Sequence, residues 1–200
     1  MLAEQLSILT HTNSECEDLY AMYFGSLQRY FLDLVPGTVH HCVVVDRPVV
    51  GNYAINQVFY DCSETVSQRL ARALDSISTE FVLFMYEDYV LYAPVDVEKI
   101  QQFTDLMQQD TEIGFIRLLQ SGAPFDGFFN GDLYKIHPNA SYFFTTQATI
   151  WRTSILKKLM QMDLMPRPQS EQILSPCLAD ICSLGLCVTA QGPAVGSHHD

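Results

Sequence analysis

Two patterns of apolar positions divide the chain into predicted strands and helices. Residues 81–86 form an unbroken apolar run, which is typical of a strand covered on both faces of a parallel sheet. Further short strands are predicted at residues 6–10, 41–46, 57–61 and 113–118. Apolar residues at helical spacing predict helices at residues 14–34, 63–77 and 96–107. Ser14 is the expected N-cap of the first helix. This order predicts an α/β fold with a mostly parallel central sheet and helices on both faces.

The pattern changes in the second half of the chain. Residues 120–139 are rich in Gly, Pro, Asp, Asn and aromatic side chains, and they predict a long loop over the ligand-binding edge of the sheet. An apolar strand is then expected at 142–150, helices at 153–162 and 171–183, and an edge strand at 186–190. Because no internal repeat is present, residues 1–200 are interpreted as one domain, which is also compatible with a piece of a longer chain.

Composition narrows the function classes. A hydrophobic content of 48% predicts a sizeable core. The formal net charge of −12 argues against binding to nucleic acid or to anionic lipid, both of which require basic surfaces. An anionic substrate would need a metal ion or a few well-placed arginines, because the chain has only 11 Lys and Arg residues.

Cysteines and termini indicate the compartment. The six cysteines show no CxxC pair and no Cys/His spacing of a metal site, which favours a reducing environment. The N-terminus lacks the basic and apolar regions of a signal peptide, and no apolar run approaches the length of a membrane span. We therefore expect a soluble, cytoplasmic protein.

The predicted strand at residues 81–86 ends in two adjacent carboxylates, Glu87 and Asp88. Ligands of open α/β sheets bind beyond the carboxyl ends of the strands. Two neighbouring acids repel each other unless a cation or hydrogen bonds offset their charge, and a divalent metal that carries a phosphate would do so. Two interpretations stay open from this stretch alone: a metal–phosphate site, and a solvated acidic turn that closes a core strand.

Three segments resemble glycosyltransferases of the GT-A fold, which transfer a sugar from a nucleotide donor. The first, residues 67–91, contains a helix with an arginine and then a strand that ends in an acidic pair, in place of the usual Asp-x-Asp. The second, residues 141–152, is similar to the Ser-x-Gln-x-x-Ile-Trp strand of bacterial and large-virus members, with Gln147 and Trp151 at the matching positions. The third, residues 168–171, lies where those members carry a Pro-Trp-x-x-Glu-like element, although its Trp is absent here. The small size also resembles the capsid-glycosylating enzymes of algal viruses.

The resemblance implies roles at a donor site. Asp88 is the expected ligand of a Mn²⁺ or Mg²⁺ ion that also binds the donor diphosphate. Glu87 is expected to bind the ribose or to reach the metal through water, unless its side chain turns into the helix layer. Arg69 would pair with phosphate or with Asp88, the alternative being a surface arginine. Thr10 and His11, at the end of the first strand, resemble the loop that holds the base and the ribose.

Four further acids complete the implied site. Asp46 and Asp61 end the next two strands, and in similar enzymes one such acid accepts a hydrogen bond from uracil or ribose. Asp61 is favoured, although both also suit turns. Glu171 is the candidate general base, because an inverting transfer needs a carboxylate to take the proton of the acceptor hydroxyl; the helix dipole explains an acid at a helix start equally well. Asp126, in the predicted loop, is a second catalytic candidate.

Together these features predict a metal-assisted, inverting glycosyltransferase that uses a nucleotide-diphosphate sugar, with a UDP-sugar favoured, and a glycan or protein-linked acceptor. One alternative is a non-catalytic domain of the same fold that binds nucleotide or sugar. Another is a nucleotidyltransferase. Such an enzyme needs a loop after the first strand that is rich in glycine and basic residues, whereas residues 11–14 contain no glycine, lysine or arginine. A dinucleotide oxidoreductase is disfavoured because GxGxxG follows none of the strands.

Overall fold

The structure, a computed structural model, describes residues 1–120, 125–140, 142–162 and 170–188, and for residues 170–173 the backbone alone. Its strands are β1 (Leu6–His11), β2 (His41–Val45), β3 (Asn56–Phe59), β4 (Phe81–Tyr86), β5 (Ile113–Arg117), β6 (Phe125–Asn130), β7 (Leu133–Ile136), β8 (Thr149–Arg152) and β9 (Leu184–Val188). Its α-helices are α1 (Leu2–Gln5), α2 (Glu17–Tyr30), α3 (Val66–Leu74), α4 (Val97–Gln109), α5 (Thr153–Met160) and α6 (Ser170–Ile181). Two short 3₁₀ turns, η1 (Ser14–Cys16) and η2 (Leu32–Leu34), flank α2.

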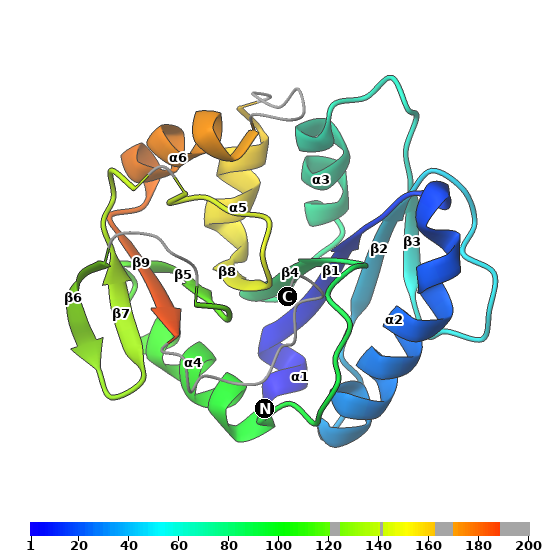
Figure 1. The fold of residues 1–200 in the computed structure, drawn as a ribbon, viewed down its shortest axis with the longest axis horizontal. Coiled ribbons are helices and arrows are strands. Elements are labelled where there is room, and N and C mark those ends of the chain that lie inside the picture. Colours follow the sequence, from blue (N-terminus) through cyan, green and yellow to red (C-terminus); the bar gives the residue numbers. More distant parts are fainter. Residues whose placement is uncertain (121–124, 141, 163–169, 189–200) are drawn as a thin grey trace.

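All nine of these strands belong to one sheet, in the order β3-β2-β1-β4-β8-β5-β9-β7-β6. The half that contains β3, β2, β1 and β4 is parallel. Strand β8 runs antiparallel between β4 and β5, while β5 and β9 are parallel to each other (Figure 1). The hairpin of β6 and β7 extends the sheet beyond β9. The predicted α/β class, with a mixed and mostly parallel sheet, is confirmed.

Helices cover both faces of the sheet, each over its own apolar core. The core on one face includes side chains of α2 and α4, and the core on the other face includes side chains of α3, α5 and α6. Figure 1 shows α3, α5 and α6 along the upper side of the molecule and α4 along its lower side. Strands β1, β2 and β5 are buried at every position, as expected of strands covered on both faces of the sheet. Trp151 is fully buried against Phe115 and Phe144, as expected of a core residue.

Three local predictions are wrong. The long loop at residues 120–139 contains β6 and β7, whose pairing has register shifts and a glycine at positive φ, Gly127, so no regular alternation marks them in the sequence. The last strand is not at an edge, because β9 lies between β5 and β7. Ser14 does not cap the first helix: Asn13 accepts the hydrogen bond from the Glu15 N–H, and α2 begins only at Glu17.

Element boundaries also differ from those expected. The strand predicted at residues 142–150 is ordered as β8 only from Thr149, and α3 is shorter than the predicted helix at 63–77. Within the described residues, no helix has the length and the apolar character needed to cross a bilayer.

Candidate functional site

The acidic pair directly follows β4, at the carboxyl edge of the parallel half of the sheet. Strand β4 lies between β1 and β8, so its end is near the centre of the sheet. The chain then turns, since the Tyr89 N–H donates to the Tyr86 carbonyl, and Tyr89 packs into the core. The Leu91 N–H donates to the Ser26 hydroxyl of α2 at 3.1 Å. The segment that carries the pair is therefore anchored on both sides.

Glu87 is deeply buried for an ionisable residue, with 5% of its surface exposed. The Cys16 thiol hydrogen-bonds its carboxylate, and Oε2 has no hydrogen-bond partner among the described residues. Burial raises the pKa of Glu87 above its ordinary value, and the charge of the adjacent Asp88 adds to that rise. Burial and the Glu87 carboxylate raise the pKa of Cys16 to about 12. Asp88 is half-buried.

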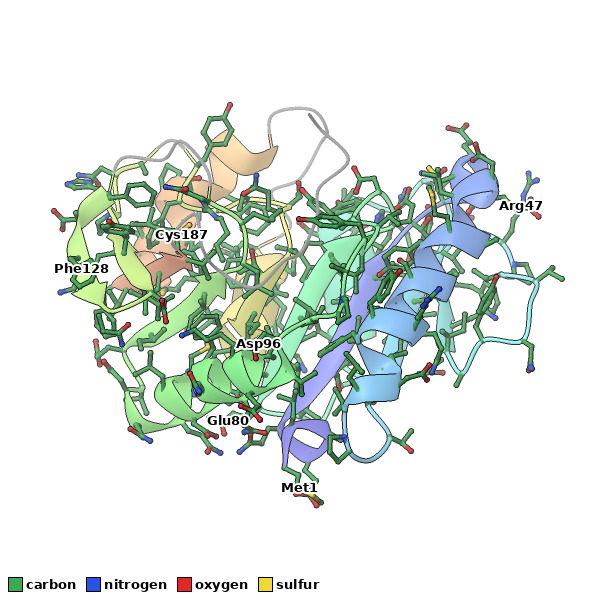
Figure 2. The ribbon with its side chains drawn as sticks, turned by 60° about the horizontal axis from the view of Figure 1, so that its bottom comes forward. Met1, Arg47, Glu80, Asp96, Phe128 and Cys187 are labelled. Carbon is green, nitrogen blue, oxygen red and sulfur yellow. The ribbon has the colours of Figure 1, made fainter. Side chains whose placement is uncertain are left out.

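A cleft of about 700 Å³ opens beyond the carboxyl ends of β1 and β2. Three segments line it: the turn after β1, the end of β2, and the connection from β3 into the first turn of α3. The lining residues are His11, Asn13, Ser14, Glu15, Asp46, Arg47, Tyr60, Cys62, Ser63, Glu64, Thr65, Val66 and Arg69. Figure 2 shows Arg47 at the end of the molecule opposite Phe128, so the cleft is in the β1–β3 half of the protein.

A chain of ring contacts connects the cleft to the acidic pair. The Arg69 guanidinium lies 3.9 Å from the centroid of the Tyr60 ring. The Tyr60 ring is stacked on His11 with a centroid distance of 5.7 Å and an interplanar angle of 5°. His11 in turn contacts Tyr86, the residue before Glu87, at 5.2 Å. The wall of the cleft is therefore in contact with Tyr86, the residue that precedes the acidic pair.

Arg69 comes from α3, whose start is fixed by a capping box between Thr65 and Gln68. One guanidinium nitrogen donates to the Cys62 carbonyl at 3.1 Å, and the guanidinium stacks on Tyr60. The Nε atom is buried and makes no hydrogen bond to a described residue. Arg69 thus lines the cleft, and no ion pair between it and Asp88 is present among the described residues.

The two predicted strand-end acids have different surroundings. Asp46 lines the cleft and accepts two hydrogen bonds from Ser14, from the backbone N–H at 2.6 Å and from the hydroxyl at 2.7 Å. Partial burial raises the pKa of Asp46, but these hydrogen bonds outweigh it, so that pKa lies below its ordinary value. Asp61 is exposed and accepts a hydrogen bond from the Ser63 N–H at 2.8 Å, which lowers its pKa.

The side chains of Thr10 and His11, at the end of β1, have different surroundings. The Thr10 side chain is fully buried, and its hydroxyl contacts the Tyr23 hydroxyl at 2.6 Å and the His41 Nε2 at 2.9 Å. Burial lowers the pKa of His41 to about 3, so this network contains a neutral imidazole. The Thr10 side chain therefore supports β1 from the core, whereas His11 lines the cleft.

Of the two predicted catalytic acids, Asp126 alone has a described side chain. Asp126 is exposed on β6, the outermost strand, five strand positions from β4 and so about 24 Å away across the sheet. Glu171 is the second residue of α6, and its side chain lies outside the described residues.

Sequence reasoning missed the aromatic and sulfur residues of the site. Tyr60 and Tyr86 each stand one position before a predicted acid, and that position next to a strand end is the signal that would have pointed to them. Arg47, which also lines the cleft, directly follows the predicted acid Asp46. Cys16 has no sequence signal, because its contact with Glu87 joins segments 71 positions apart.

The acidic pair suits a hard divalent cation that takes few protein ligands. In the part of the chain that the structure describes, no group of three or more His, Cys, Asp or Glu side chains could hold a metal. Mg²⁺-type sites are commonly completed by substrate phosphates and water around one or two carboxylates. The buried, unpartnered Oε2 of Glu87 fits such an environment, because buried polar atoms in proteins nearly always have a partner.

Comparison with known proteins identifies the fold. No protein-family model and no curated protein matches the sequence. The structure of S. aureus TarS 1–349 in complex with UDP-GlcNAc is similar with a TM-score of 0.63 and 14% identity, over 98% of this chain and 59% of that one. The complex of the same TarS fragment with UDP has a TM-score of 0.59 and 14% identity, over 94% of this chain and 59% of the TarS chain. The fold is therefore GT-A-like, and this chain spans less than two thirds of the TarS fragment.

Proposed function

We propose that this protein is a glycosyltransferase that moves a sugar from a UDP-sugar to a glycan or protein-linked acceptor. The observation that carries the proposal is the acidic pair at the carboxyl edge of a GT-A-like sheet, together with a cleft whose wall contacts the residue before that pair. The similar TarS structures include complexes with UDP-GlcNAc and with UDP, which supports a uridine donor.

Two arginines of the cleft would offset part of the charge of a diphosphate donor, although Glu15, Asp46 and Glu64 line the same cleft. The protein has a net charge of −12, so an anionic donor needs local positive groups. Arg47 and Arg69 both line the cleft, and the Nε–H of Arg69 is available for a hydrogen bond. We assign the uridine to the cleft, near His11, Asp46 and Asp61. Glu87 and Asp88 would hold a Mn²⁺ or Mg²⁺ ion, which offsets the charge of the departing diphosphate when it is bound.

An inverting reaction further requires a base for the acceptor hydroxyl. Glu171 remains the candidate because it belongs to the third segment of the resemblance, residues 168–171, and it is the second residue of α6. The position of Asp126 on the outermost strand argues against a role in proton transfer at the acidic pair.

Thermal unfolding with UDP and GDP, each with and without Mn²⁺, tests the donor assignment. A ligand at a hundredfold excess over its dissociation constant stabilises the native state by about 2.7 kcal/mol. We expect UDP to raise the midpoint by several degrees only with Mn²⁺, and Asp88→Ala to abolish this rise. Asp33→Ala, at an exposed position after α2, is the matched control and should retain it.

Turnover then separates the enzyme from a non-catalytic nucleotide-binding domain. Release of UDP from UDP-GlcNAc, with and without candidate glycan acceptors, should fall at least tenfold in Glu171→Gln while UDP binding is retained. Nucleotide binding without turnover of any UDP-sugar would favour the non-catalytic domain. The absence of a shift with either nucleotide would overturn the donor site.

A further inference from the structure

Gln147 lies beside the acidic pair because β8 runs antiparallel to β4. The last residue pair of these strands joins Phe84 to Thr149, so the start of β8 is at the edge where β4 ends (Figure 1). Gln147 precedes Thr149 by two residues, about 7 Å of extended chain, and Glu87 follows Phe84 by three, about 10 Å. Both residues therefore extend beyond the same end of two neighbouring strands.

The backbone of Gln147 is held on both sides. Its N–H donates to the Thr145 hydroxyl at 3.4 Å, and its carbonyl accepts from the Thr149 hydroxyl at 2.8 Å. The preceding segment is also fixed, since the fully buried Arg117 donates to the carbonyls of Tyr142 and Phe143 at 2.7 and 3.3 Å. The backbone position of Gln147 is thus defined by the fold before any ligand binds.

The carboxamide oxygen of Gln147 nevertheless lacks a hydrogen-bond partner in the part of the chain that the structure describes. Its Oε1 is buried and makes no hydrogen bond to a described residue. An unsatisfied buried acceptor is unfavourable, and such atoms are rare enough in native proteins to require an explanation. A rigid backbone with an unsatisfied acceptor at the edge of a candidate ligand site is the arrangement expected of a preorganised ligand contact.

We propose that Gln147 Oε1 accepts a hydrogen bond from a hydroxyl of the sugar that is transferred. This inference rests on the proposed function. The acidic pair is assigned to the diphosphate and its metal, and the sugar is the group attached next to that diphosphate. A neutral carboxamide suits an uncharged hydroxyl donor better than it suits phosphate or a second cation. Because a site built to bind a hydroxyl discriminates strongly against ligands without it, Gln147 is a specificity-determining residue.

Binding measurements with Gln147→Met test this role. The substitution keeps the length of the side chain and removes its acceptor. Calorimetry with Mn²⁺ compares UDP, UDP-GlcNAc and UDP-glucose. We expect the affinity for UDP to stay within twofold of wild type and the affinity for the preferred UDP-sugar to fall about tenfold or more. Gln161→Met, at an exposed position after α5, is the matched control and should change neither.

The stability of the ligand-free protein distinguishes a binding role from a structural one. If Oε1 is kept for a ligand, Gln147→Met removes an unsatisfied buried acceptor, and the melting midpoint stays the same or rises. A residue with a structural role would instead lower the midpoint when substituted. A retained midpoint together with weaker binding of the UDP-sugar is the combination that supports the inference.

The possible failures have different signatures. If Gln147→Met weakens the binding of UDP and of the UDP-sugar equally, or weakens neither, the role of Gln147 is overturned and the proposed function still stands. If wild-type protein binds neither UDP nor a UDP-sugar, the proposed function and this inference both fail.

Discussion

Glu87 combines deep burial with an ionisable side chain at the end of a strand. Its raised pKa means that the folded protein favours the neutral acid more than the unfolded chain does. The contribution of Glu87 to stability is therefore fully present below about pH 4.5, its ordinary pKa, and is lost as the pH rises through the higher pKa of the folded state.

Glu87→Gln should accordingly stabilise the ligand-free protein at neutral pH. Glutamine mimics the protonated acid, so we expect a gain on the order of 1 kcal/mol, or about 2–4 °C in midpoint, at pH 7.5 and little change at pH 4. Thermal unfolding at the two pH values measures it. Glu64→Gln is the control and should lower the midpoint at pH 7.5, because hydrogen bonds from Arg72 stabilise the charged form of Glu64 and lower its pKa. A lower midpoint of Glu87→Gln at pH 7.5 would contradict the prediction.

At the scale of elements, two features position the site: the start of α3 and the tight packing of β9 against β5. The capping box at Thr65 satisfies the first N–H groups of the helix that carries Arg69. Gly185 in β9 lies against the Phe115 ring of β5, and a Cβ at this position would be 2.1 Å from Phe115 Cζ.

Thr65→Ala should destabilise the protein by about 1 kcal/mol, since it removes the hydrogen bond from the Gln68 N–H to the Thr65 hydroxyl. Chemical denaturation measures the change. Thr111→Ala, in an exposed turn, is the matched control and should stay within about 0.5 kcal/mol of wild type. Equal effects of the two substitutions would show that the cap contributes nothing.

Gly185→Ala should destabilise the folded protein more than Thr65→Ala does, by about 1–3 kcal/mol, because the added methyl group meets a buried ring. The midpoint of thermal unfolding should fall by several degrees. Gly131→Ala is the control, since a Cβ at Gly131 meets no atom within 4 Å. An unchanged midpoint in Gly185→Ala would mean that the Phe115 ring moves freely, against its full burial.

At the scale of the whole molecule, the long sheet separates the acidic pair from Asp126, although the sequence analysis assigned both to one catalytic site. The cleft and the acidic pair lie in the half that contains β1 to β4, whereas the β6–β7 hairpin is at the opposite end of the sheet (Figure 1). Asp126 belongs to this hairpin.

Asp126→Asn should therefore leave UDP binding and UDP-sugar turnover within twofold of wild type, because about 24 Å of sheet separates it from the acidic pair. The same assays on Asp88→Asn should show at least a tenfold loss. A large loss of turnover in Asp126→Asn with unchanged UDP binding would place the hairpin in the catalytic site after all.

The sequence by itself determined the core strands, the helices of the first half and the acidic strand ends, because these are local patterns of apolar run, helical spacing and abrupt polarity. Tertiary structure alone decided that β8 inserts antiparallel, that residues 125–136 form an outer hairpin, and that Thr10 faces the core while His11 faces the cleft. Strand pairing and side-chain partners depend on contacts between distant segments, such as Cys16 with Glu87 and Tyr60 with His11, and no local pattern encodes them.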